Sequence, residues 1–148
     1  MKINISILGQ PIAKARPRFR RAGKFVQTYS PQESEEGMWV LKAQQQIKDA
    51  GIFFDGLITI RLRYYTRRPK GHFGTGRNSH ILKPSAPKYP DTSNDLDNYI
   101  KFTFDCLNHC GIWVDDAKVI GIHAWHRFAD IYGPGPSTEI EITDVIED

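Results

Sequence analysis

The residues best suited to chemistry lie between positions 91 and 119. Asp95 and Asp97 are one residue apart, Lys101 follows four positions after Asp97, and Asp115 and Asp116 form an adjacent pair. Carboxylates that are brought together raise one another's pKa, so clustering them costs free energy. A hard divalent cation such as Mg²⁺ removes that cost, because it binds through one or two carboxylates together with phosphate and water oxygens. The pattern therefore favours a site for a divalent metal ion.

An amphipathic helix is expected to position the first of these groups. From residue 96 to residue 109 apolar side chains recur with helical periodicity, and Gly111 follows as a plausible C-cap. Residues two apart on a helix point in different directions, so Asp95 and Asp97 converge only if Asp95 precedes the regular helix. Its residue type is one that caps helix starts, and Lys101 lies one turn beyond Asp97.

The second carboxylate pair requires the chain to reverse. After Gly111, the apolar run Ile112-Trp113-Val114 is expected to be buried and to bring Asp116 back toward the start of the helix. Two roles remain open for Asp115: it supports the metal ligands, or it caps the loop.

Several motifs in this stretch resemble the RusA family of Holliday-junction resolvases. They are Asp-Leu-Asp-Asn-x-x-Lys at 95–101, Phe-Asp-x-Leu at 104–107 and Gly-x-Trp-x-Asp-Asp-Ala-x-Val at 111–119. Two further segments are similar to the phage and prophage branch of the family. These are Gly-Gln-Pro-x-x-Lys-x-Arg-Pro-Arg at 9–18 and the Gly-, Pro- and Lys-rich stretches at 69–78 and 83–89.

The resemblance implies a homodimeric endodeoxyribonuclease that resolves four-way DNA junctions by paired, symmetric nicks in recombination and repair. It implies Mg²⁺ as the cofactor, with Mn²⁺ as an alternative. Carried over position by position, Asp95, Asp97 and Asp116 are the expected metal ligands. Lys101 completes the expected catalytic set by stabilising the scissile phosphate.

Two other classes of protein remain open: a branched-DNA-binding protein that has lost catalysis, and a Mg²⁺-dependent phosphotransfer enzyme for small substrates. The chain also departs from the family pattern at two places. Asn94 stands where the phage branch commonly has proline, which leaves Asp91 as an extra ligand or an alternative register. His126, followed by Arg127, stands where relatives often carry lysine.

Basic residues are concentrated near the N-terminus, whereas residues 129–148 carry acidic side chains and no Lys or Arg. A basic segment interrupted by Pro and Gly favours contact with a polyanion such as DNA. The segment 9–29 is expected to be a basic loop, and arginines on one face of a predicted strand and at the end of another extend the surface. The expected DNA-binding residues are Lys14, Arg16, Arg18, Arg20, Arg21, Lys24, Arg61, Arg63 and Arg127.

Hydrophobic periodicity predicts a single α+β domain over residues 1–148. Strands are expected at 2–8, 57–66, 118–128 and 137–143, and helices at 31–50 and 96–109. The order is β-α-β-α-β-β, and we expect a mostly antiparallel sheet covered by helices on one face. Residues 67–92 are expected to form a long flexible loop that becomes ordered on DNA.

Composition sets the broad class. The chain has 148 residues, a formal net charge of +3, 40% hydrophobic residues and 25% charged residues, which is typical of a globular domain. No apolar run approaches the length of a membrane span and no signal-peptide pattern is present. Cys106 and Cys110 are too few for a disulfide framework, so buried structural thiols and a cytoplasmic location are expected.

Overall fold

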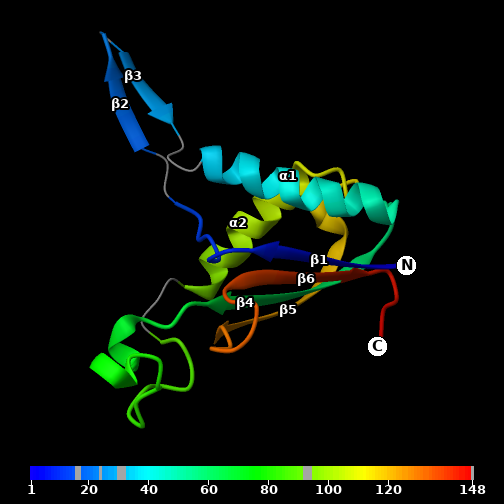
Figure 1. The fold of residues 1–148 in the computed structure, drawn as a ribbon. Coiled ribbons are helices and arrows are strands. Elements are labelled where there is room, and N and C mark those ends of the chain that lie inside the picture. Colours follow the sequence, from blue (N-terminus) through cyan, green and yellow to red (C-terminus); the bar gives the residue numbers. More distant parts are fainter. Residues whose placement is uncertain (16–17, 24, 30–32, 92–94, 148) are drawn as a thin grey trace.

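The computed structural model describes residues 1–15, 18–23, 25–29, 33–91 and 95–147, with side chains left out at 18–22 and 25–29. Its main sheet has four strands in the order β1-β6-β4-β5 (Figure 1). The strands are β1 (Lys2–Leu8), β4 (Ile58–Thr66), β5 (Val119–Phe128) and β6 (Ser137–Thr143), close to the predicted ranges. The expected single-domain α+β architecture is therefore confirmed.

The sheet is mixed, which corrects the expectation of a mostly antiparallel one. Strand β6 pairs antiparallel with both β1 and β4, whereas β4 and β5 run parallel. Helix α2 (Leu96–Asn108) lies between β4 and β5 in the chain. A helical crossover returns the chain to the end of the sheet where β4 began, so the next strand must run parallel to it.

Both long helices cover the same face of the sheet (Figure 1). Helix α1 (Glu33–Ala50) buries Trp39, Ala43 and Ile47 against it, as the sequence predicts. In α2 the buried positions are Tyr99, Phe102, Thr103, Cys106 and Leu107. The strands contribute every second residue to this core, as in the buried Ile3, Ile5 and Ile7 of β1. No helix in the described part of the chain is long and apolar enough to cross a membrane.

The basic segment near the N-terminus is not a loop throughout, which corrects the prediction for 9–29. Strands β2 (Arg18–Ala22) and β3 (Phe25–Tyr29) form an antiparallel hairpin that extends away from the main sheet (Figure 1). Ala22 pairs with Phe25, so the turn has only two residues, and Gly23 has a φ of 63°. Glycine supplies the positive φ that tight hairpin turns require. The overlooked strand signal is the group of aromatic and β-branched residues that follows this glycine, namely Phe25, Val26, Thr28 and Tyr29.

Residues 67–91, here called the lobe, have more internal structure than the predicted flexible loop. One 3₁₀ turn, Lys70–His72, precedes a β-bridge between Phe73 and Leu82, and a second, Gly76–Asn78, lies in the segment that this bridge closes. The amide of Gly74 donates to the carbonyl of Ile81 at 3.0 Å. A Cβ at Gly74 would lie 2.7 Å from the Cβ of Asn78, so this close approach requires glycine.

Strand β5 forms one edge of the sheet. Ile122 pairs with the buried Ile60, so both side chains leave the sheet on its helix-covered face. Even so, Ile122 is 50% exposed and Ile120 is 52% exposed. The alternation that predicts a strand here is confirmed, but the helices leave these two apolar side chains partly uncovered.

Candidate functional site

The first predicted group lies at the start of α2, as expected. Asp95 is the N-cap residue, with extended backbone angles, and its side chain makes no capping hydrogen bond. The Lys101 Nζ lies 3.6 Å from an Asp97 carboxylate oxygen, and both side chains are about two-thirds exposed. The carboxylates and the lysine therefore face solvent at a helix N-terminus, where the helix dipole favours anions such as a phosphate.

Asp116 lies at the opposite end of α2, which corrects the expectation that the loop returns it to the helix start. The side-chain amide of Asn108, the last residue of α2, donates to Asp116 Oδ2 at 2.9 Å. The indole N–H of Trp113 donates to Asn108 Oδ1 at 2.8 Å. Trp113 is buried, so this chain of hydrogen bonds fixes the position of the Asp116 carboxylate. Sequence reasoning did not single out Asn108, because its role depends on the path of the following loop.

The adjacent Asp115 has a local structural role. Its Oδ1 accepts a hydrogen bond of 2.9 Å from the amide of Ala117 and caps a 3₁₀ turn, Asp116–Lys118. Of the two roles left open for this residue, the structure shows the loop cap. Asp91 is exposed, and no contact with another residue that the structure describes assigns it a role.

The two ends of α2 are too far apart to share one metal ion within one subunit. Twelve residues separate Asn108 from Leu96, which at the rise of an α-helix corresponds to about 18 Å. Among the described residues, no three His, Cys, Asp or Glu side chains are grouped closely enough to hold a metal. One end offers Asp95 and Asp97 and the other offers Asp116, and oxygen donors of this kind suit Mg²⁺.

The two cysteines do not add to these candidate metal ligands. Cys106 and Cys110 are free and buried. Burial raises the pKa of the Cys106 thiol to about 12 and that of the Cys110 thiol to about 11. Both thiols are neutral near pH 7, and the thiolate is the form that binds metals. The predicted structural role of these residues agrees with their burial.

His126, which stands at one of the departures from the family pattern, packs beside the start of α2. Its ring lies edge-on to Tyr99 at 5.1 Å between centroids. Its Nε2 is 2.9 Å from the hydroxyl of Thr66, and desolvation lowers the pKa of the imidazole. The imidazole of His126 is therefore neutral at pH 7, whereas a lysine side chain would carry a positive charge.

A lowered pKa at His126 links folding to pH. The unfolded chain binds the proton near the ordinary pKa of about 6.5, whereas the folded chain takes it up only at lower pH. We therefore expect the free energy of unfolding to fall as the pH drops below about 6.5. Urea unfolding of wild type and His126→Gln between pH 7.5 and pH 5 measures this, with smaller pH dependence expected in the variant. His80→Gln, at an exposed site, is the control; equal slopes in all three proteins would contradict the assignment.

The predicted DNA-binding residues are not all brought together. Lys14 pairs with Glu36 at 3.3 Å and with Asp105 at 2.9 Å, so it ties the N-terminal segment to both helices. The amide of Lys14 also donates to the carbonyl of Asn98 at 3.0 Å. Arg16 and Lys24 lie outside the described residues, and Arg18, Arg20 and Arg21 are described only by their backbone in β2.

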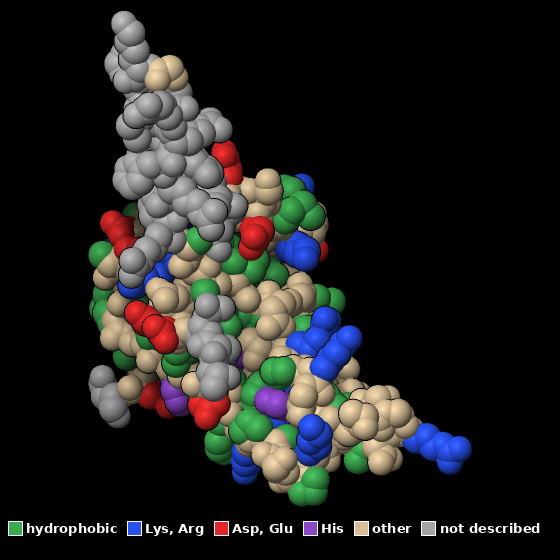
Figure 2. All heavy atoms as spheres, turned by 90° about the vertical axis from the view of Figure 1, so that its left-hand side faces the viewer, with side chains coloured by type: hydrophobic (Ala, Val, Ile, Leu, Met, Phe, Trp, Pro, Cys, Tyr) green, Lys and Arg blue, Asp and Glu red, His purple; other side chains and the backbone are tan. Residues whose placement is uncertain are grey.

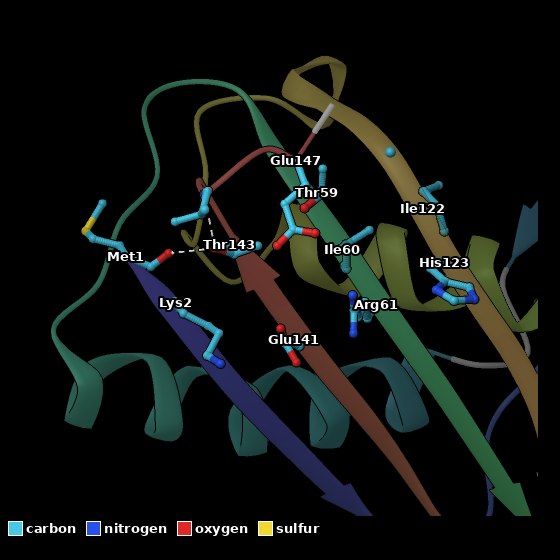
Figure 3. Close-up of a pocket in the computed structure, with 12 residues that line it drawn as sticks. Met1, Lys2, Thr59, Ile60, Arg61, Ile122, His123, Glu141, Thr143 and Glu147 are labelled. Atoms are coloured by element: carbon cyan, nitrogen blue, oxygen red, sulfur yellow. Dashed lines mark hydrogen bonds between the residues drawn. The ribbon is translucent and has the colours of Figure 1, made fainter.

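Arg61 and Arg63 lie on the open face of the sheet, away from α2. In the pairing of β4 with β6 they are opposite Glu141 and Glu139. A hollow of about 640 Å³ on this face is lined by side chains of both signs, including Lys2, Arg61, Glu141 and Glu147 (Figure 3). The carboxylates on the neighbouring strand weaken the attraction of these two arginines for DNA. Contact of Arg61 and Arg63 with DNA stays a prediction.

The lobe forms a second basic surface. Between residues 67 and 91 it has six Lys or Arg residues and one Asp, and Figure 2 shows blue side chains spread over this lower part of the molecule. None of these cations forms an ion pair with a residue that the structure describes. Unpaired cations attract the phosphates of DNA, and their binding releases counterions. The six are Arg67, Arg68, Lys70, Arg77, Lys83 and Lys88.

Comparisons with known proteins agree with the motifs. A family model described as endodeoxyribonuclease RusA matches residues 9–143. The chain is also 29% identical over 147 residues to an uncharacterized protein, YqaN, of Bacillus subtilis strain 168. That alignment covers 97% of this chain and 96% of YqaN, so the similarity extends over both chains nearly from end to end.

Proposed function

The chain belongs to the RusA family of endodeoxyribonucleases, and from that premise we propose that it resolves four-way DNA junctions by paired nicks that depend on Mg²⁺. The observation that carries the proposal is the placement of the carboxylates at the two ends of α2. One subunit presents Asp95 and Asp97 at one end of the helix and Asp116 at the other. A second subunit can complete both ends at once.

Two-fold symmetry explains how a second subunit can complete both ends of α2. In a symmetric dimer, if residue i of one subunit contacts residue j of the other, then j also contacts i. If two α2 helices pack antiparallel, the start of each lies beside the end of the other. Asp95 and Asp97 of one subunit then share a site with the partner's Asp116. The dimer has two equivalent sites, as paired nicks in a two-fold junction require.

The surface between the two ends suits such an interface. Phe104 lies midway along α2 and is only partly buried; its ring is 5.6 Å from that of Trp113. Val114, which follows Trp113 in the chain, is 62% exposed, and Ile120 and Ile122 are half exposed on the edge strand. Burial of these exposed apolar side chains against another protein surface would be favourable.

The roles of the residues follow from their chemistry. Asp95, Asp97 and the partner's Asp116 would hold the divalent ion, which when bound supplies charge neutralisation at the phosphate and a nucleophilic water. Lys101 is one helical turn from Asp97, and its ammonium group would contact a non-bridging oxygen of the scissile phosphate. The hydrogen bonds of Asn108 with Trp113 and Asp116 would keep the Asp116 carboxylate in place for the partner subunit. Mn²⁺ offers similar chemistry with oxygen ligands.

Cleavage of a labelled synthetic junction tests the proposal directly. In Mg²⁺ we expect symmetric nicks in two opposite strands, and no cutting of a linear duplex of the same sequence. Excess chelator is expected to stop the nicking, and restored Mg²⁺ to recover it, because the carboxylates cannot supply the charge neutralisation alone. Tight junction binding without nicks would instead indicate a catalytically silent binding protein.

The proposed interface makes a separate prediction for Ile122. Ile122→Asp places a charge on the partly exposed apolar surface, and we expect the dimer to dissociate and nicking to be lost. Sedimentation velocity reports the oligomeric state, and circular dichroism checks that the monomer is folded. Leu41→Asp is a matched control, because Leu41 is 63% exposed on α1. A dimer that persists in Ile122→Asp would place the interface elsewhere.

A further inference from the structure

We infer that the cavity between the lobe and the end of β5 holds one unstacked nucleotide of a DNA strand, with its phosphate on Arg127 and Lys88 and its base against Tyr89. The binding site is separate from the carboxylates that act on the scissile phosphate. The inference rests on the proposed function, since the strand is taken to be part of a junction.

The cavity has a suitable size and lining. Its volume is about 310 Å³, at the lower end of the range of about 300–1,000 Å³ for small-ligand pockets. Lys88, Tyr89, Arg127 and Phe128 line it, and Tyr89 is 49% exposed. An aromatic ring that is accessible and flanked by cations is the arrangement that binds single strands, because every base has a face that stacks.

The cations are held in place by the aromatic rings. The guanidinium carbon of Arg127 lies 5.0 Å from the centroid of Tyr89, and the Lys88 ammonium lies 5.4 Å from it. A guanidinium stacked on a ring keeps its N–H groups in the plane free for a phosphate. Hydrogen bonding with Arg127, followed by the charge of Lys88, lowers the pKa of Tyr89, so both cations lie close to this side chain.

Side chains of the lobe contact Phe128, which lines the cavity from the end of β5. The Arg68 guanidinium lies 4.2 Å from the centroid of Phe128 and donates to the carbonyl of Pro87 at 2.7 Å. The His72 ring meets the same phenyl ring edge-on at 5.4 Å. These contacts attach the lobe to the end of β5, so the cavity exists without a ligand. Such preorganisation lowers the entropy cost of binding.

The charges that line the cavity favour binding of an anion, even though one carboxylate is among them. Asp130 also lines the cavity, and its Oδ1 accepts a hydrogen bond of 3.0 Å from the amide of Tyr132. Three cationic side chains, those of Arg68, Lys88 and Arg127, line the same space. The excess of positive charge suits a phosphodiester, which carries a single negative charge.

The cavity also lies close to the proposed nicking site. Arg127 directly follows His126, whose ring contacts Tyr99 in the first turn of α2. Tyr89 precedes Asp95 by only six residues in the chain. A strand that enters the nicking site at the start of α2 can therefore reach the cavity. At a junction the branch point provides nucleotides that unstack at low cost.

Fluorescence anisotropy with a labelled oligothymidine, a four-way junction and a linear duplex tests the inference, with Ca²⁺ in place of Mg²⁺. We expect Tyr89→Ala to weaken binding of the oligothymidine and the junction by about tenfold, and binding of the duplex by less than about twofold. Tyr89→Phe keeps the stacking ring and should bind like wild type. Arg127→Gln should reduce the salt dependence of oligothymidine binding by about one phosphate contact.

Two surface variants serve as matched controls. Tyr132→Ala removes a tyrosine that is 90% exposed and outside the cavity lining, and Lys48→Gln removes an exposed cation of α1 that also lies outside it. If Tyr89→Ala behaves like Tyr132→Ala, or weakens duplex and single-strand binding equally, the inference is wrong. Nicking is measured separately in Mg²⁺. A wild type that binds through Tyr89 but never nicks would contradict the proposed function and leave the cavity assignment intact.

Discussion

Replacement of Asp97 by asparagine is expected to lower the rate of junction nicking by at least about 1,000-fold, which corresponds to about 4 kcal/mol of transition-state stabilisation. The amide removes one negative charge from the metal ligands and also the partner of Lys101, 3.6 Å away. Rates under single-turnover conditions with saturating enzyme measure the chemical step separately from binding.

The fold and junction binding should survive the Asp97→Asn change. The Asp97 side chain is 67% exposed, and removing its charge relieves repulsion with Asp95. Thermal unfolding should therefore be unchanged, and affinity for the junction in Ca²⁺ should stay within a few-fold of wild type. Asp49→Asn, an exposed change on α1, is a control for loss of a surface carboxylate. Wild-type nicking by Asp97→Asn would remove this residue from the catalytic set.

A mixture of two inactive variants is expected to recover activity if the site is shared between subunits. In a mixed dimer of Asp97→Asn and Asp116→Asn, one composite site has both substitutions and the other has neither. Random pairing makes about half of the dimers mixed, each with one intact site of two, so nicking should return to about a quarter of the wild-type level. Because only one site works, the product should be a nicked junction and not a resolved one.

The matching control combines Asp95→Asn with Asp97→Asn. Both residues lie at the same end of α2, so a mixed dimer of these variants has one substitution in each site and should stay inactive. Differently tagged subunits purified as mixed dimers make the comparison independent of exchange rates. No recovery in the Asp97→Asn and Asp116→Asn mixture would show that each site lies within one subunit or uses other ligands.

Local patterns in the sequence determined most of the elements. Period-two alternation predicts the four strands of the main sheet, and helical periodicity predicts α1 and α2, because one face of each element must be buried. The N-cap position of Asp95 also follows from local rules, since Asp95 and Asp97 cannot converge on a regular helix. The turn at Gly23 follows from local rules as well, but Pro11, Pro17 and Gly23 together favoured a loop over a hairpin in this segment.

Only the tertiary structure decided how these elements are arranged. The parallel pairing of β4 and β5 depends on where the crossover through α2 returns, and this path has no local signature in the sequence. For the same reason the motif that contains Asp95, Asp97 and Asp116 could not reveal that α2 separates them. The hydrogen bond from Asn108 to Asp116 and the contacts of Tyr89 with Arg127 join residues whose proximity depends on loops. The sequence therefore determined which residues are suited to the chemistry, whereas the tertiary structure decided which of them one subunit can bring together.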